Sequence, residues 1–123
     1  MLEYIYFNIT KQERDRIDHE SAIRGRTRSK TLSTAIRIAT SNYTNFSLAD
    51  QLLEIPIPAP RYYQVYIRMS EEERSIIEHA ASIRYRSPAS LMYTIARSVT
   101  NGFTSFSIID NGSDKNKEET YDH

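Results

Sequence analysis

The chain has 123 residues, equal numbers of basic and acidic side chains, and no cysteine. A chain of this length forms one ordinary domain, or two very small units that share a core. The lack of cysteine excludes a disulfide framework, a thiol nucleophile and a cysteine-based metal site. No run of about 18 apolar residues predicts a membrane helix, and no signal pattern opens the sequence. We therefore expect a cytoplasmic protein that carries no cofactor and no metal.

The neutral total hides an uneven distribution of charge. Residues 108–123 carry five acidic side chains and two lysines, whereas the other 107 residues carry 14 basic and 11 acidic side chains. Within the larger part, Arg24, Arg26, Arg28 and Lys30 fall in seven residues that contain no acidic side chain. A local basic patch of this kind is typical of proteins that bind nucleic acid.

The strongest pattern in the sequence is an internal repeat with a spacing of 60 residues. When residues 4–47 are aligned without gaps to residues 64–107, fourteen of the 44 positions are identical. The identical pairs are Tyr6/Tyr66, Glu13/Glu73, Arg14/Arg74, Ile17/Ile77, His19/His79, Ile23/Ile83, Arg24/Arg84, Arg26/Arg86, Thr34/Thr94, Arg37/Arg97, Thr40/Thr100, Thr44/Thr104, Phe46/Phe106 and Ser47/Ser107. Such a repeat indicates one structural unit that is used twice.

Each copy begins with a segment in which every second side chain is apolar, as in a strand with one buried face. The apolar sets are Ile5, Phe7 and Ile9 in one segment and Val65, Ile67 and Met69 in the other. The side chains between them should point away from the core, and these are Tyr4, Tyr6, Asn8, Gln64, Tyr66 and Arg68. A lone strand has no partner, so we expect the two strands to pair antiparallel.

A first helix should follow each strand. Thr10 and Ser70 open Ser/Thr-x-x-Glu capping boxes, which predict helices over about 11–24 and 71–84. The later helix carries an apolar stripe of Ile77, Ala80 and Ala81, with Ile76 and Ile83 beside it. The earlier helix keeps only Ile17, Ala22 and Ile23 among its charges. We therefore expect the earlier helix to pack less well.

A second helix should follow after a short turn. Gly25 is placed to end the first helix of copy one in a left-handed residue. Its counterpart Tyr85 does not adopt that conformation cheaply, so we expect the other turn to be built differently. Thr27 and Ser87 are the predicted N-caps of the second helices, and Pro88 takes the favoured first helical position. Their apolar faces are Leu32, Ala35, Ile36 and Ala39, matched by Met92, Ile95, Ala96 and Val99.

The repeat divides the chain into four parts. Copy one spans residues 1–47, a proline-containing linker spans 48–63, copy two spans 64–107 and an acidic tail spans 108–123. Residues 55–60 should be extended and stiff, and the composition of the tail is typical of disorder. One copy buries too little surface to fold alone, so we expect both copies to form one compact domain.

The alternating strands, the capping boxes and the segment 25–29 that leads into the second helix resemble the ribbon-helix-helix superfamily of MetJ/Arc-type proteins. In that family two chains normally supply the two copies, whereas here one chain does. The tandem form with a proline-containing joint and an acidic tail is similar to the TraY family, the relaxosome accessory proteins of F-like conjugative plasmids. The resemblance spans about residues 3–107. It implies an α+β, mostly helical pseudo-dimer with a two-stranded antiparallel ribbon and four helices.

A two-stranded ribbon fits the major groove of DNA, so the outward side chains of the strands are candidate base contacts. Arg68 suits guanine, and the amides of Asn8 and Gln64 suit adenine. Tyr4, Tyr6 and Tyr66 offer a hydroxyl and a ring for a thymine methyl group or a phosphate. The alternative for each is an ordinary solvated strand face. Copy one departs from the basic outward set of the family, since its row is Tyr, Tyr and Asn.

The starts of the second helices are candidate phosphate contacts, because free amides and the positive end of the helix dipole attract anions. The candidates are Arg26, Thr27, Arg28 and Ser29 in copy one, and Arg86, Ser87 and Ala89 in copy two. Pro88 has no N–H group, so we expect the two copies to grip DNA unequally. The alternative is helix capping for the hydroxyl groups and solvated surface charge for the arginines.

The favoured hypothesis is a non-enzymatic protein that binds double-stranded DNA. As the resemblance implies, it would bind near an origin of transfer, assist the relaxase together with other relaxosome proteins, and regulate transfer genes. Binding of several copies of the chain side by side on DNA is compatible with this hypothesis. The alternatives are a plasmid or phage transcriptional repressor and an antitoxin-like protein. The last is disfavoured because residues 110–123 offer only Tyr121 as an apolar anchor.

Overall fold

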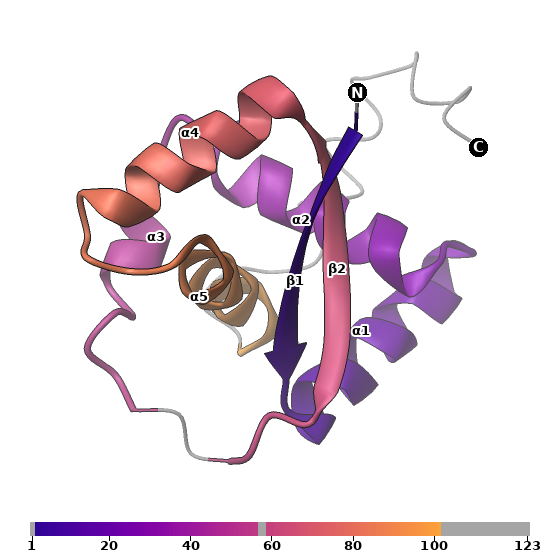
Figure 1. The fold of residues 1–123 in the computed structure, drawn as a ribbon. Coiled ribbons are helices and arrows are strands. Elements are labelled where there is room, and N and C mark those ends of the chain that lie inside the picture. The colour runs from indigo at the N-terminus through magenta and orange to yellow at the C-terminus, as the bar shows by residue number, and fades with distance from the viewer. Residues whose placement is uncertain (1, 57–58, 102–123) are drawn as a thin grey trace.

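A two-stranded antiparallel sheet lies over five helices in the computed structural model, which describes residues 2–56 and 59–101 (Figure 1). The elements in chain order are β1 (Leu2–Ile9), α1 (Lys11–Arg24), α2 (Arg28–Ala39), α3 (Ser47–Asp50), β2 (Tyr63–Ser70), α4 (Glu71–Ser82) and α5 (Pro88–Thr100). The described residues are thus a small α+β domain. The predicted tail, residues 108–123, and the last residues of copy two, 102–107, lie outside the described residues.

The two strands pair along their whole length, and the antiparallel pairing expected from the sequence is confirmed. Tyr6 lies opposite Tyr66, the residue that is also its counterpart in the 60-residue repeat. The ladder is therefore centred on equivalent positions of the two copies. On either side of this centre, Tyr4 faces Arg68 and Asn8 faces Gln64.

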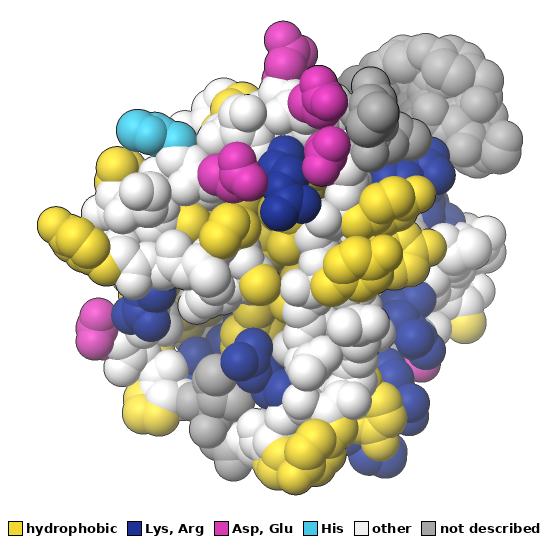
Figure 2. Space-filling view, viewed as in Figure 1, with side chains coloured by type: hydrophobic (Ala, Val, Ile, Leu, Met, Phe, Trp, Pro, Cys, Tyr) yellow, Lys and Arg dark blue, Asp and Glu magenta, His cyan; other side chains and the backbone are white. Residues whose placement is uncertain are grey.

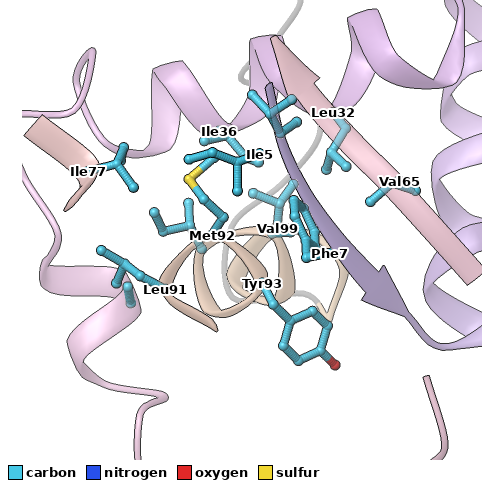
Figure 3. Close-up of a cluster of buried hydrophobic side chains, with 14 of the residues drawn as sticks. Ile5, Phe7, Leu32, Ile36, Val65, Ile77, Leu91, Met92, Tyr93 and Val99 are labelled. Atoms are coloured by element: carbon cyan, nitrogen blue, oxygen red, sulfur yellow. The ribbon is translucent and has the colours of Figure 1, made fainter. Parts of the chain in front are cut away.

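The inner faces of the strands close a core around α5. All six predicted inward side chains of the strands are buried, and Figure 3 shows Ile5 and Phe7 beside Met92, Tyr93 and Val99 of α5. Every side chain of α5 from residue 91 to residue 100 is buried, because this helix packs against β1, α2, α3 and α4. The predicted apolar face of the last helix is therefore confirmed.

Both predicted capping boxes are present. The hydroxyl of Thr10 accepts a hydrogen bond from the amide of Glu13 and the Glu13 carboxylate accepts one from the amide of Thr10, and Ser70 and Glu73 repeat this exchange. α1 has the predicted bounds, and α4 ends two residues earlier than expected.

The two first helices bury different amounts of apolar surface. α4 buries three apolar side chains, Ile77, Ala80 and Ala81, whereas Ile17 is the one apolar side chain that α1 buries. The weaker packing expected of α1 is consistent with this difference. The apolar stripe of α4 is narrower than predicted, because Ile76 and Ile83 are exposed to solvent.

The prediction about the two turns is half right. Gly25 has the expected left-handed conformation, with φ 64°. Tyr85 has φ 57°, so the prediction that its turn is built differently is wrong. Both turns are closed by the same backbone hydrogen bond, from the amide of Arg26 to the carbonyl of Ser21 (3.0 Å) and from the amide of Arg86 to the carbonyl of Ala81 (2.9 Å). The side chain of Tyr85 is 96% exposed, so no neighbour opposes the conformation.

The segment between the copies is not simply an extended linker. The short helix α3 begins at the last residue of copy one and continues into this segment, so the described residues contain five helices instead of the four predicted. Ala49 and Leu52 are buried, and Asp50 forms two hydrogen bonds with Arg84 at 2.6 Å and 3.1 Å. These contacts link α3 to the turn between α4 and α5. They join residues 34 positions apart, a separation that a local composition pattern does not report.

Candidate nucleic-acid interface

The outer face of the sheet carries all six predicted base-contacting side chains. Tyr4, Tyr6 and Tyr66 are 40%, 52% and 41% exposed, and Asn8, Gln64 and Arg68 are also exposed. Figure 2 looks onto this face and shows hydrophobic-class side chains, the class that includes tyrosine, gathered over the two strands. Lys and Arg side chains lie beside them on the side of α1, and acidic side chains lie over the start of α4.

The three exposed tyrosines form one aromatic cluster. Their ring centroids lie 6.2 Å apart for Tyr4 and Tyr6, 5.5 Å apart for Tyr4 and Tyr66, and 5.9 Å apart for Tyr6 and Tyr66. Ring pairs at these distances attract one another. The cluster therefore holds the hydroxyl groups of the outer face in a defined arrangement before any ligand is present. This mutual contact was not expected from the sequence, although the period-2 pattern places the three residues on one face.

An open groove of about 460 Å³ runs between the start of α2 and β2. We call it the α2 groove. It is lined by Thr27, Ser29, Lys30, Ser33, Arg37, Tyr66, Arg68, Met69, Ser70 and Glu73. The groove thus joins two predicted phosphate contacts, Thr27 and Ser29, to two predicted base contacts, Tyr66 and Arg68. Residues from the two copies meet in it, because α2 belongs to copy one and β2 belongs to copy two.

The wall of the α2 groove is held in place by Arg37. Its Nη2 donates to the carbonyl oxygen of Arg68 at 2.8 Å and lies 3.4 Å from the carboxylate of Glu73. The backbone of β2 is therefore tied to α2 at the residue whose side chain is the sharpest predicted base contact. Lys30 was predicted only as part of the basic patch, and Arg37 was not predicted as a site residue. The identity of Arg37 and Arg97 in the repeat was the available signal.

The predicted caps of the second helices are confirmed. The hydroxyl of Thr27 accepts from the amide of Lys30, and the hydroxyl of Ser87 accepts from the amide of Ser90, both at 3.1 Å. Pro88 occupies the first turn of α5, as expected. Ser29 and Ala89 lie in the first turns of α2 and α5, where backbone amides lack partners within the helix.

Two of the predicted phosphate-binding arginines already have acidic or carbonyl partners. Arg28 donates from Nε and Nη2 to the carboxylate of Asp18 at 2.7 Å and 3.0 Å, and these hydrogen bonds raise its pKa. Arg86 donates from Nη2 to the carbonyl of Leu53 at 3.1 Å and lies 3.5 Å from the carboxylate of Glu54. Arg26 is half-buried. A phosphate would therefore compete with Asp18 for Arg28, and with the segment between the copies for Arg86.

Comparison of the chain with protein-family models, with curated proteins and with solved structures finds no match. None of the helices in residues 2–56 and 59–101 has the length and apolar character needed to cross a lipid bilayer. A function for the outer face of the sheet must therefore be inferred from the geometry of its own residues.

Proposed function

We propose that the chain is a double-stranded DNA-binding protein that reads sequence through the major groove. In this proposal the two copies form a tandem ribbon-helix-helix pseudo-dimer, with β1 and β2 as the ribbon. The observation that carries it is the outer face of the sheet, where six polar and aromatic side chains lie exposed beside an open groove at a helix start. A two-stranded ribbon of this width enters the major groove and presents its outward side chains to base edges.

Each outward side chain has a chemical role in this proposal. Arg68 donates two hydrogen bonds to guanine, and Asn8 and Gln64 pair with adenine through their amides. The tyrosine cluster supplies ring surface for thymine methyl groups and hydroxyl groups for bases or phosphates. The α2 groove receives the DNA backbone beside the ribbon, where helix amides and Lys30 favour a phosphate.

The fusion of both copies in one chain favours an asymmetric DNA site. The outward rows differ, since one is Tyr, Tyr and Asn and the other is Gln, Tyr and Arg. A symmetric dimer reads a palindrome, whereas unlike rows distinguish the two strands of their target. An origin of transfer that is nicked on one strand needs this distinction. We therefore propose a relaxosome accessory role, with the relaxase and other relaxosome proteins as partners and the regulation of transfer genes as a second role.

The experiment that tests DNA reading is selection of a preferred duplex from a random library, followed by titrations with Arg68→Ala. We expect a loss of about 1–3 kcal/mol on the selected duplex and a relaxed preference at one base pair. Arg16→Ala is the matched control, because Arg16 is an exposed arginine on α1. Equal affinity of the unaltered protein for selected and scrambled duplexes would refute the proposal.

A plasmid or phage repressor is the alternative within the same DNA-reading class. A nicking assay separates the two roles. If the chain is a relaxosome accessory protein, it should raise the nicked fraction of a supercoiled plasmid treated with the cognate relaxase, and Arg68→Ala should not. Unchanged nicking, together with repression of a reporter promoter that contains the selected site, would favour the repressor.

A further inference from the structure

The two sides of the ribbon differ in positive charge. The α5 side, which lies between the start of α5 and β1, is the counterpart of the α2 groove under the 60-residue repeat. Three cations of the α2 side have no charged counterpart there, since Pro88 replaces Arg28, Ser90 replaces Lys30 and Asn8 replaces Arg68. A DNA backbone that crosses both flanks of the ribbon would meet far fewer cations on the α5 side.

The arginine that is present in both copies also plays different roles. Arg37 donates to the carbonyl of Arg68 in β2. Its counterpart Arg97 does not hold β1 in this way, because Nη1 and Nη2 donate to the carbonyls of Ile55 and Pro56, each at 2.7 Å. Arg97 therefore anchors the segment between the copies on α5.

On the α5 side, Arg61 makes the hydrogen bond to the strand that Arg37 makes on the α2 side. Its Nη1 donates to the carbonyl of Asn8 at 3.3 Å, and Asn8 is the repeat counterpart of Arg68. The same strand carbonyl is thus held by an arginine on both sides of the ribbon. On the α5 side this arginine comes from the segment between the copies, six residues along the chain from the anchored Ile55.

The guanidinium of Arg61 is held in a fixed orientation. Its central carbon lies 4.2 Å from the ring centroid of Tyr93, and the Tyr93 hydroxyl donates to the carboxylate of Glu13, with oxygens 2.9 Å and 3.2 Å away. Tyr93 is buried and Arg61 is half-buried. A guanidinium has five N–H donors, and the hydrogen bond to Asn8 uses one of them. Stacking on an aromatic ring orients the plane of an arginine and leaves its edge for a phosphate.

We propose that Arg61 is the phosphate-binding cation of the α5 side, so that the segment between the copies forms part of the DNA-binding surface. The ligand is a phosphate of the DNA backbone beside the ribbon. This inference rests on the proposed DNA binding and adds a residue that the repeated units do not supply. The chain thereby replaces, from its joining segment, charge that copy two lacks at its helix start.

The test is a salt titration of DNA binding with Arg61→Ala and Arg61→Lys. Loss of one phosphate contact should reduce the slope of log affinity against log salt by about 0.9. For Arg61→Ala we expect that reduction, with an equal fold loss of affinity on the selected and on the scrambled duplex. Arg61→Lys keeps the charge and should keep the slope. Thermal unfolding of both variants is measured alongside, and a phosphate role predicts the slope change at temperatures where each variant is fully folded.

The side of the contact is mapped with cleaving labels. The chain has no cysteine, so Ala22→Cys and Ser82→Cys each accept a single iron chelate at an exposed site beside one of the two turns. Phosphate-ethylation interference identifies the phosphate that no longer affects binding when Arg61 is replaced by Ala. This phosphate should lie on the same flank of the duplex that the Ser82→Cys label cuts. An unchanged slope in Arg61→Ala, or interference lost on the other flank, would overturn the inference while leaving DNA binding intact. If the unaltered protein prefers no duplex, the proposed function itself fails.

Discussion

At the scale of single residues, Tyr43 is a core side chain with an unpaired hydroxyl group. It is 1% exposed, and its hydroxyl makes no hydrogen bond within the described part of the chain. Burial raises the pKa of this phenol to about 12, since the charged form is poorly solvated in the core. A buried polar group without a partner destabilises the folded state by about 1–3 kcal/mol.

Removing this hydroxyl with Tyr43→Phe should raise the free energy of unfolding at pH 7 by about 1 kcal/mol. The folded pKa lies above the unfolded value, so as the pH rises from 10 toward 12 the unfolded chain ionises at Tyr43 before the folded protein does, and the free energy of unfolding falls. The Phe variant should therefore lose less stability than the parent between pH 8 and pH 11. Urea unfolding across that range measures both effects. Parallel pH curves, with no gain at neutral pH, would contradict the burial argument.

The sequence places single residues well when only the local period matters. Alternation along each strand was enough to predict all six side chains of the outer face. Partners distant in the sequence were not predictable in this way. The pairing of Arg28 with Asp18 depends on how α1 and α2 pack, and the placement of Arg61 over Tyr93 depends on the path of the joining segment. Such contacts follow from the fold and not from spacing.

At the scale of elements, the turns after α1 and α4 are the same structure built from unlike residues. Gly25 adopts its left-handed conformation without steric cost, and a Cβ atom added there would meet nothing within 4 Å. Tyr85 holds the same conformation with a side chain, which costs roughly 1–2 kcal/mol for an L-residue. The strain at Tyr85 therefore comes from its own backbone conformation and not from contacts with neighbouring side chains.

Replacing the strained residue with Tyr85→Gly should raise the free energy of unfolding by about 1 kcal/mol, after the extra entropy of glycine in the unfolded chain is subtracted. The matched variant Gly25→Ala should lower it by a similar amount, because the added Cβ meets only its own backbone. Chemical denaturation of the two variants beside the parent gives both values. A lower free energy of unfolding for Tyr85→Gly would contradict this argument, because it would mean that the exposed tyrosine ring stabilises the fold by packing.

Elements that carry their own start and stop signals were predictable. Capping hydroxyls and glutamates lie within four residues of one another, so they reveal the starts of α1 and α4 from the sequence. α3 carries no side-chain cap at its start, and it is tied to the rest of the fold by Asp50 and Arg84. A four-residue helix held by tertiary contacts leaves no periodic pattern, so the sequence predicted only a linker over residues 48–54, before the extended stretch expected at 55–60.

At the scale of the whole molecule, the internal repeat predicted the strand pairing. The pairing puts Tyr6 against Tyr66, so an approximate two-fold axis passes between repeat counterparts. Rotation about this axis exchanges Tyr4 with Gln64 and Asn8 with Arg68 on the outer face. On the ribbon, the departures from this symmetry lie in the side chains, since each of these four residues differs from its counterpart. In the proposed function these departures decide which way round the protein lies on DNA.

Exchanging the unlike rows tests whether the ribbon itself sets this orientation. The variant carries Tyr4→Gln, Asn8→Arg, Gln64→Tyr and Arg68→Asn, and its outer face is the original one turned by half a revolution. If the ribbon decides, the Ala22→Cys label should cut the opposite flank of the selected duplex, since each misread base pair costs about 1–3 kcal/mol. If the label still cuts the original flank, the cations around the ribbon decide instead. Arg61→Ala is then added to the exchanged rows, and it removes the cation of the joining segment alone. If the label now cuts the opposite flank, the joining segment sets the orientation. If the flank stays the same, the cations of the α2 groove set it.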